Sequence, residues 1–168
     1  AWVQIDEPAV TTHPEEVGLF VEAFNESVRG LTERARFSTH ICFSDYTNLF
    51  PEILELEGCQ AYQLELSNRD PWERGVDRAA RSGYHILDLF AEHEAPGAVG
   101  LGVVDIHDDR LEPVDLVEDR IRYALDVLGD PEKVWPCTDC GLRTRTWETS
   151  FEKLSVLAEA AGRVRQDR

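Results

Sequence analysis

The chain has 168 residues and a formal net charge of −16, from 17 Lys and Arg against 33 Asp and Glu. This length suits one hydrophobic core. The acidic balance argues against nucleic-acid binding, which needs a basic surface, and no apolar run approaches the ~20 residues of a membrane-spanning helix. We therefore expect neither a nucleic-acid nor a membrane partner. Because the chain has no Met and begins in a strand-like segment, we interpret it as part of a longer protein.

Short apolar runs alternate with helical patterns along the whole chain. In order, the sequence predicts a strand at residues 2–5, a helix that starts at 11–16, a strand at 37–43, a short helix at 48–56, a strand at 61–66, a helical segment at 70–92, a strand at 99–106, a helix at 112–128, a strand at 133–138 and a helix at 147–164. Helix 112–128 is the clearest, because its apolar residues recur on one side. The sequence Gly129-Asp130-Pro131 ends it.

Five alternations of strand and helix predict an α/β fold with parallel strands and helical crossovers. Such a pattern permits an open doubly wound sheet or part of a (β/α)₈ barrel. A full barrel typically needs ~250 residues, so five βα units in this length would make a little over half of one.

Every predicted strand ends in polar or metal-binding side chains. Strand by strand, these are Asp6, His40 with Cys42, Glu65, Asp105 with His107, and Cys140. Ligands of α/β folds bind at the carboxyl ends of parallel strands. A polar residue at the end of one strand carries little information. Polar or metal-binding residues at the ends of all five strands indicate a functional site.

His40 and Cys42 stand two residues apart, so an imidazole and a thiol face the same side of a strand. Together with Glu65 and Cys140 they form a donor set that is typical of Zn²⁺. A zinc ion with these ligands suits the binding and deprotonation of a thiol. Because free thiols persist in a reducing compartment, we expect a cytoplasmic protein.

Other interpretations of the polar residues stay open. Cys137 and Cys140 have the spacing of half a zinc ribbon or of a redox pair, although Cys42 and Cys59 supply no second close pair. His107, beside Asp105, is a candidate acid or base, or else a surface histidine. Asp6 could hold an ammonium group of a ligand, or end the strand before Pro8.

Five ordered motifs resemble the catalytic domain of cobalamin-independent methionine synthase, over nearly the whole chain. They are Gln4-Ile5-Asp6-Glu7-Pro8-Ala9, Thr39-His40-Ile41-Cys42-Phe43-Ser44-Asp45-Tyr46, Leu64-Glu65-Leu66-Ser67-Asn68-Arg69, Gly100-Leu101-Gly102-Val103-Val104-Asp105-Ile106-His107 and Asp139-Cys140-Gly141-Leu142-Arg143-Thr144-Arg145. The resemblance implies one domain over residues 1–168. This domain would be the carboxy-terminal portion, about five βα units, of a (β/α)₈ TIM barrel without its amino-terminal part.

The resemblance also implies roles for six residues. His40, Cys42, Glu65 and Cys140 match the family's zinc ligands, Asp6 its contact to the homocysteine amino group, and His107 its proton donor. By this likeness, the enzyme moves a methyl group from 5-methyltetrahydrofolate, or from a methyl-corrinoid protein, to the homocysteine thiol and makes methionine.

Some features depart from the family or leave alternatives. The family usually has Asn-Pro-Asp before the late Cys, whereas this chain has Cys137-Thr138-Asp139, so Cys137 could compete as a ligand. A homologous zinc thiol-alkyltransferase of the epoxyalkane–coenzyme M transferase type is a second hypothesis, which Asp6 disfavours. A third is a non-catalytic half-barrel that a second chain or a missing segment completes.

Overall fold

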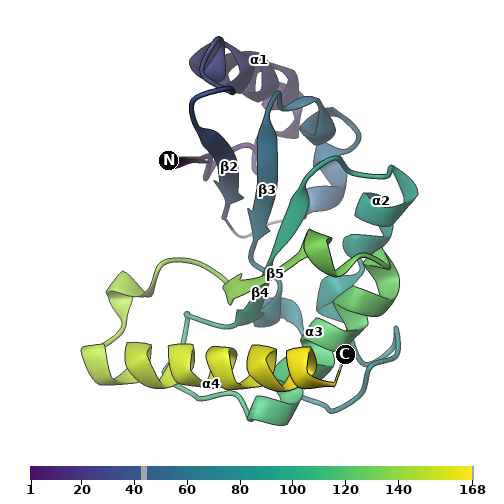
Figure 1. The fold of residues 1–168 in the computed structure, drawn as a ribbon, viewed down its shortest axis with the longest axis vertical. Coiled ribbons are helices and arrows are strands. Elements are labelled where there is room, and N and C mark those ends of the chain that lie inside the picture. Colours follow the sequence, from purple (N-terminus) through teal and green to yellow (C-terminus); the bar gives the residue numbers. More distant parts are fainter. Residues whose placement is uncertain (43–44, 168) are drawn as a thin grey trace.

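The computed structural model describes residues 1–42 and 45–167, and its core is a five-stranded parallel sheet (Figure 1). The strands are Trp2–Asp6 (β1), Arg36–Ile41 (β2), Cys59–Leu64 (β3), Ala98–Val104 (β4) and Val134–Thr138 (β5). They lie in the order β1-β2-β3-β4-β5. A doubly wound sheet reverses its strand order at a switch point, whereas this order continues in one direction. The predicted partial (β/α)₈ barrel is therefore confirmed as the fold class. Phe43, the expected end of the second strand, lies outside the described residues.

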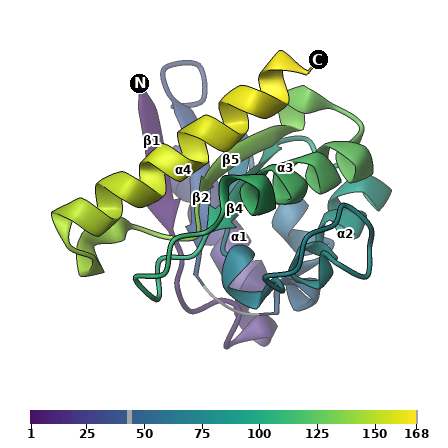
Figure 2. The ribbon, with the colours of Figure 1, turned by 90° about the horizontal axis from the view of Figure 1, so that it is seen from below.

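In the part of the chain that the structure describes, four α-helices cover the outer side of this sheet. They are Val17–Val28 (α1), Leu87–Glu92 (α2), Val114–Leu128 (α3) and Trp147–Gln166 (α4). Helices α3 and α4 pack against each other and against β4 and β5 (Figure 2). Between β2 and β3, the expected short helix is replaced by two 3-10 turns, Tyr46–Leu49 and Glu52–Glu55. Pro51 stands between these turns, where its missing N–H and its ring interrupt a continuous helix.

The prediction of a helix over residues 70–92 is wrong for most of its length, because only Leu87–Glu92 is α-helical. Gly75 has a φ of 144°, which a helix does not accept. Acidic side chains replace helical hydrogen bonds: the Asp119 carboxylate accepts from the Gly75 N–H at 2.9 Å, and Asp77 accepts from the N–H of Ala79 and of Ala80. Tertiary contacts therefore decide the conformation of this segment.

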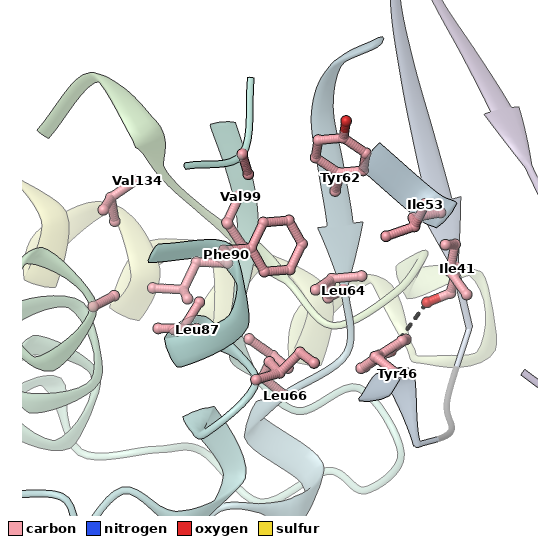
Figure 3. Close-up of a cluster of buried hydrophobic side chains, with 14 of the residues drawn as sticks. Ile41, Tyr46, Ile53, Tyr62, Leu64, Leu66, Leu87, Phe90, Val99 and Val134 are labelled. Atoms are coloured by element: carbon pink, nitrogen blue, oxygen red, sulfur yellow. Dashed lines mark hydrogen bonds between the residues drawn. The ribbon is translucent and has the colours of Figure 1, made fainter. Parts of the chain in front are cut away.

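The hydrophobic core lies between the outer face of the sheet and the helices (Figure 3). Ile41, Leu64 and Val99 project into it from three neighbouring strands, where Leu87 and Phe90 of α2 meet them. All seven residues of β4 are buried, whereas β1 is largely exposed. The core therefore centres on β3 and β4, and β1 is an edge strand.

The sheet is strongly curved. Trp2 of β1 and Trp135 of β5 lie on its two outermost strands, yet their ring centroids are only 5.4 Å apart. A flat sheet would separate these strands by roughly 19 Å, four times the interstrand spacing. The concave face of the partial barrel therefore encloses space, and the carboxyl ends of the strands open onto it. Among the described residues, no helix is long and apolar enough to cross a membrane.

Candidate metal and active site

Four potential metal ligands converge at the carboxyl ends of β2, β3 and β5. The ligand atoms of His40, Cys42, Glu65 and Cys140 all lie within 4.8 Å of one another. The His40 Nε2 atom is 3.2 Å from the Cys140 Sγ atom, 3.5 Å from the Cys42 Sγ atom and 4.0 Å from the Glu65 Oε1 atom. The structure thus brings together the four residues that the sequence pattern predicted as metal ligands.

The strand pattern explains why these residues meet. His40 lies in β2 and Cys42 follows its last residue, so both project to the concave side. Glu65 comes directly after β3, and Cys140 comes two residues after β5. Since all strands are parallel, these positions lie at one end of the sheet.

The donor atoms fit a tetrahedral divalent metal. With metal–ligand bonds of ~2.0–2.3 Å, tetrahedral geometry separates ligands by about 3.3–3.8 Å, close to the observed 3.2–4.0 Å between His40 and its three neighbours. His40 and Glu65 are buried. Burial, and then the nearby Cys140 and Glu65, raise the pKa of the Cys42 thiol to about 12. A bound cation would offset this repulsion and favour the thiolate.

His107 reaches this cluster from the loop after β4. Its Nε2 atom lies 3.1 Å from the Oε2 atom of Glu65, whose other oxygen faces His40. The Asp105 carboxylate accepts a hydrogen bond from the His107 backbone N–H at 2.8 Å and so orients the loop. The His107 side chain is 49% exposed. It therefore lies between the ligand cluster and solvent, where it can exchange a proton.

Asp6 lines the cavity beside the ligand cluster. This cavity has a volume of about 570 Å³ and is bounded by Gln4, Asp6, Gln63, Arg143 and three of the four cluster residues, His40, Cys42 and Cys140. Gln4 donates a hydrogen bond from its Nε2 atom to the Asp6 carboxylate at 2.8 Å. A small polar molecule in this space could contact both the carboxylate of Asp6 and the potential metal ligands.

Among the residues that the structure describes, the remaining cysteines join no group of three or more potential metal ligands. Cys137 also lines the cavity, but its sulfur is not among the four converging ligand atoms. Burial, and then the nearby Asp139, raise the pKa of its thiol to about 12. Cys59 is buried at the amino end of β3, opposite the ligand cluster. This arrangement does not support a zinc ribbon built from all four cysteines.

Three residues that hold the ligands in place were missed by the sequence analysis. The Tyr46 hydroxyl accepts a hydrogen bond from the Glu65 N–H at 3.0 Å and donates to the Ile41 carbonyl at 3.1 Å (Figure 3). Asn68 donates from its Nδ2 atom to the Glu65 carboxylate at 3.3 Å. Asp139 accepts three backbone N–H groups. The sequence offers one signal for these residues. Each lies in one of the five motifs that resemble the family, within four positions of a potential metal ligand: Tyr46, Asn68 and Asp139.

Comparison with known proteins gives a consistent result. Residues 1–163 match the model of the catalytic domain of cobalamin-independent synthase. A methionine synthase from Thermoplasma acidophilum is 43% identical over an alignment of 167 positions that covers 96% of this chain and 48% of that protein. A 5-methyltetrahydropteroyltriglutamate–homocysteine methyltransferase from Nitratidesulfovibrio vulgaris is 33% identical over 98% of this chain and 20% of its own length.

A solved structure shares the fold. It is a B12-independent methionine synthase from Shewanella sp. W3-18-1 in complex with selenomethionine, with a TM-score of 0.80 and 24% sequence identity. The match covers 99% of this chain and 49% of that chain. This chain thus spans about half the length, or less, of the proteins to which it is similar.

Proposed function

Because the chain belongs to the family of cobalamin-independent synthase catalytic domains, we propose that it is the metal-binding part of a zinc methyltransferase that converts homocysteine to methionine. The observation that carries this proposal is the convergence of four ligand atoms within 4.8 Å, with His107 against one of them. The relatives named methionine synthase support the same reaction.

His40, Cys42, Glu65 and Cys140 would hold the zinc ion. One imidazole, two thiols and a carboxylate are ligands that zinc prefers over the harder divalent ions. When bound there, zinc would favour the deprotonated form of the homocysteine thiol and so make it a nucleophile at neutral pH. The enclosed position of His40 and Glu65 keeps competing water away from these ligands.

Asp6 and His107 would act on the two reactants. Asp6 lines the same cavity as the ligands, so its carboxylate could bind the ammonium group of homocysteine. In the transfer, the bond between carbon and the donor nitrogen breaks while a sulfur–carbon bond forms. The departing nitrogen then needs a proton, which His107 could supply from its half-exposed position beside Glu65.

The methyl donor in this proposal is 5-methyltetrahydrofolate. The relative named for 5-methyltetrahydropteroyltriglutamate favours this donor, and a methyl-corrinoid protein is the alternative. A coenzyme M-type alkyltransferase is the second candidate reaction, but a sulfonate thiol gives Asp6 no ammonium group to bind. We place the enzyme in the cytoplasm, since its ligand thiols must remain reduced.

A further segment, on the same or another chain, would complete the barrel. Both β1 and β5 have one neighbour in the described sheet, so each leaves one edge unpaired. Trp147, Phe151 and Leu154 form a stripe on one face of α4 with 80%, 64% and 47% exposure. Chain length supports this completion, because this chain covers about half of the relatives named methionine synthase. Light scattering of the isolated chain would then detect self-association.

Metal analysis tests the ligand set. The purified protein should hold about one zinc per chain, and a Cys140→Ser variant should lose most of it. Cys59→Ser is the matched control, because Cys59 lies at the other end of β3. Adding homocysteine to the zinc-loaded protein should release a proton, and the Cys140→Ser variant should show no release. Unchanged zinc content in Cys140→Ser would overturn the proposed ligand set.

A further inference from the structure

Asp139 directly precedes the ligand Cys140, yet its side chain is bonded to a different segment. Its Oδ1 atom accepts the backbone N–H groups of Leu66 and Ser67, each at 3.0 Å, and its Oδ2 atom accepts that of Asn68 at 2.8 Å. These three amides follow the ligand Glu65 without interruption. One carboxylate therefore joins the segment that carries Glu65 to the segment that carries Cys140.

This connection passes over an intervening strand. Glu65 follows β3 and Cys140 follows β5, and β4 separates these strands in the sheet. The Asp139 carboxylate crosses β4 at Gly102, where a Cβ atom would lie 2.2 Å from the Asp139 Oδ1 atom and 2.5 Å from the Leu64 carbonyl oxygen. A glycine is therefore required at this point of β4, because any side chain would displace the carboxylate.

Burial and three hydrogen bonds hold the Asp139 carboxylate in this position. Asp139 is only 1% exposed, and three convergent backbone N–H groups form a small anion-binding nest around it. Charge-assisted hydrogen bonds of this kind are stronger than neutral ones. A second link, through a neutral hydroxyl, joins the end of β2 to the end of β3, because the Tyr46 hydroxyl connects Ile41 with Glu65. Glu65 and the residues after it are thus tied to the ends of β2 and β5, which carry the other ligands.

We propose that Asp139 is a positioning residue that sets the separation of the Glu65 carboxylate and the Cys140 sulfur, and through it the metal affinity of the site. The inference rests on the proposed function, because it takes the four residues to be metal ligands. Asp139 itself does not enter the ligand cluster. It acts by fixing two ligand-bearing segments that share no backbone hydrogen bonds in the sheet.

The Asp139→Asn substitution tests this role. An asparagine oxygen could still accept two of the three N–H groups, but its Nδ2 atom would face the third as a second donor. We expect zinc binding to weaken roughly 10–100-fold, the range seen when a residue that supports metal ligands is changed. Competition with a chromophoric chelator measures this affinity. Asp126→Asn, on the exposed side of α3, is the matched control with the same change in charge.

The visible spectrum of the Co²⁺-loaded protein gives a second readout. A displaced Cys140 should lower the thiolate charge-transfer absorption and alter the ligand-field bands, whereas simple loss of stability would leave both unchanged. Gly102→Ala should shift affinity and spectrum in the same direction as Asp139→Asn, although it leaves the carboxylate in the chain. If Asp139→Asn does not fold, Gly102→Ala still tests whether the Asp139 carboxylate positions the two ligands.

The outcomes separate this inference from the proposed function. Wild-type protein that binds neither Zn²⁺ nor Co²⁺ would overturn both. Wild-type protein that binds zinc, together with a folded Asp139→Asn variant of equal affinity and an identical Co²⁺ spectrum, would overturn the role of Asp139 alone. If Asp139→Asn is unfolded, a folded Gly102→Ala variant with wild-type affinity and spectrum would do the same.

Discussion

The Tyr46 hydroxyl offers a measurable link between the stability of the fold and the geometry of the site. In a Tyr46→Phe variant, the Glu65 N–H loses its acceptor at 3.0 Å and the Ile41 carbonyl loses its donor at 3.1 Å. Both groups lie in the core beside Tyr46, which is buried. Leaving a buried polar group unpaired costs ~1–3 kcal/mol. The two losses together should lower the free energy of unfolding by about 2–6 kcal/mol.

A matched substitution separates the effect of the lost hydrogen bonds from the effect of removing a buried hydroxyl oxygen. The Tyr62 hydroxyl is also buried, and it has no hydrogen-bond partner within the described residues. Tyr62→Phe should therefore change the free energy of unfolding by less than about 0.5 kcal/mol, or raise it slightly. Figure 3 shows the Tyr62 hydroxyl pointing away from the bond between Tyr46 and Ile41.

Urea denaturation with a chelator present measures both variants without any contribution from bound metal. In thermal unfolding, Tyr46→Phe should lower the Tm by roughly 4–24 °C, since about 1 kcal/mol corresponds to ~2–4 °C in a protein of this size. Equal destabilisation by the two variants, or a loss below about 0.5 kcal/mol in Tyr46→Phe, would refute the claim that this hydroxyl joins the two strand ends.

Two further predictions concern charge and exposed apolar surface. Arg120→Met should lower the free energy of unfolding by about 1–3 kcal/mol, because the buried Asp70 carboxylate loses the guanidinium at 3.1 Å and keeps only Arg81, at 2.7 Å, as a charged partner. Burial raises the pKa of Asp70, so the folded protein holds its proton at a pH where the unfolded chain has lost it. The deficit in Arg120→Met should therefore shrink as the pH falls through that raised pKa, and denaturation curves between pH 7 and pH 4 would test this. A constant deficit would contradict it. The double variant Trp147→Lys and Phe151→Glu should reduce self-association of the isolated chain in light scattering, and unchanged association would place the contact elsewhere.

The sequence predicts the fold and the convergence of four potential metal ligands, for identifiable reasons. Alternation along β2 places His40 and Cys42 on one face, and parallel strands bring Glu65 and Cys140 to the same end of the sheet. Both inferences need only local periodicity and a topological rule. The positions of Asp6 and His107 beside the ligands agree with that rule, whereas their roles in substrate binding and proton transfer stay predictions.

The features that sequence reasoning missed depend on contacts between distant segments. Asp139 bonds to residues more than 70 positions earlier, and no local pattern distinguishes it from a surface acid. The loop before α2 resembles a helix in composition, but Asp119 holds its Gly75 N–H from another element. In each case a polar side chain satisfies the backbone of a remote segment, which periodicity does not reveal.

The contact between Trp2 and Trp135 has a consequence for how the barrel would close. In an eight-stranded barrel, a strand and the fourth strand after it face each other across the central axis, and side chains fill the space between them. β1 and β5 stand in this relation, and their two rings already meet at 5.4 Å. The two indoles thus already occupy, at the amino-terminal end of the strands, the space between β1 and β5 that side chains fill in a closed barrel. A segment that supplied the remaining strands would therefore meet a half-barrel whose two edge strands already stand at the spacing that the indole contact allows.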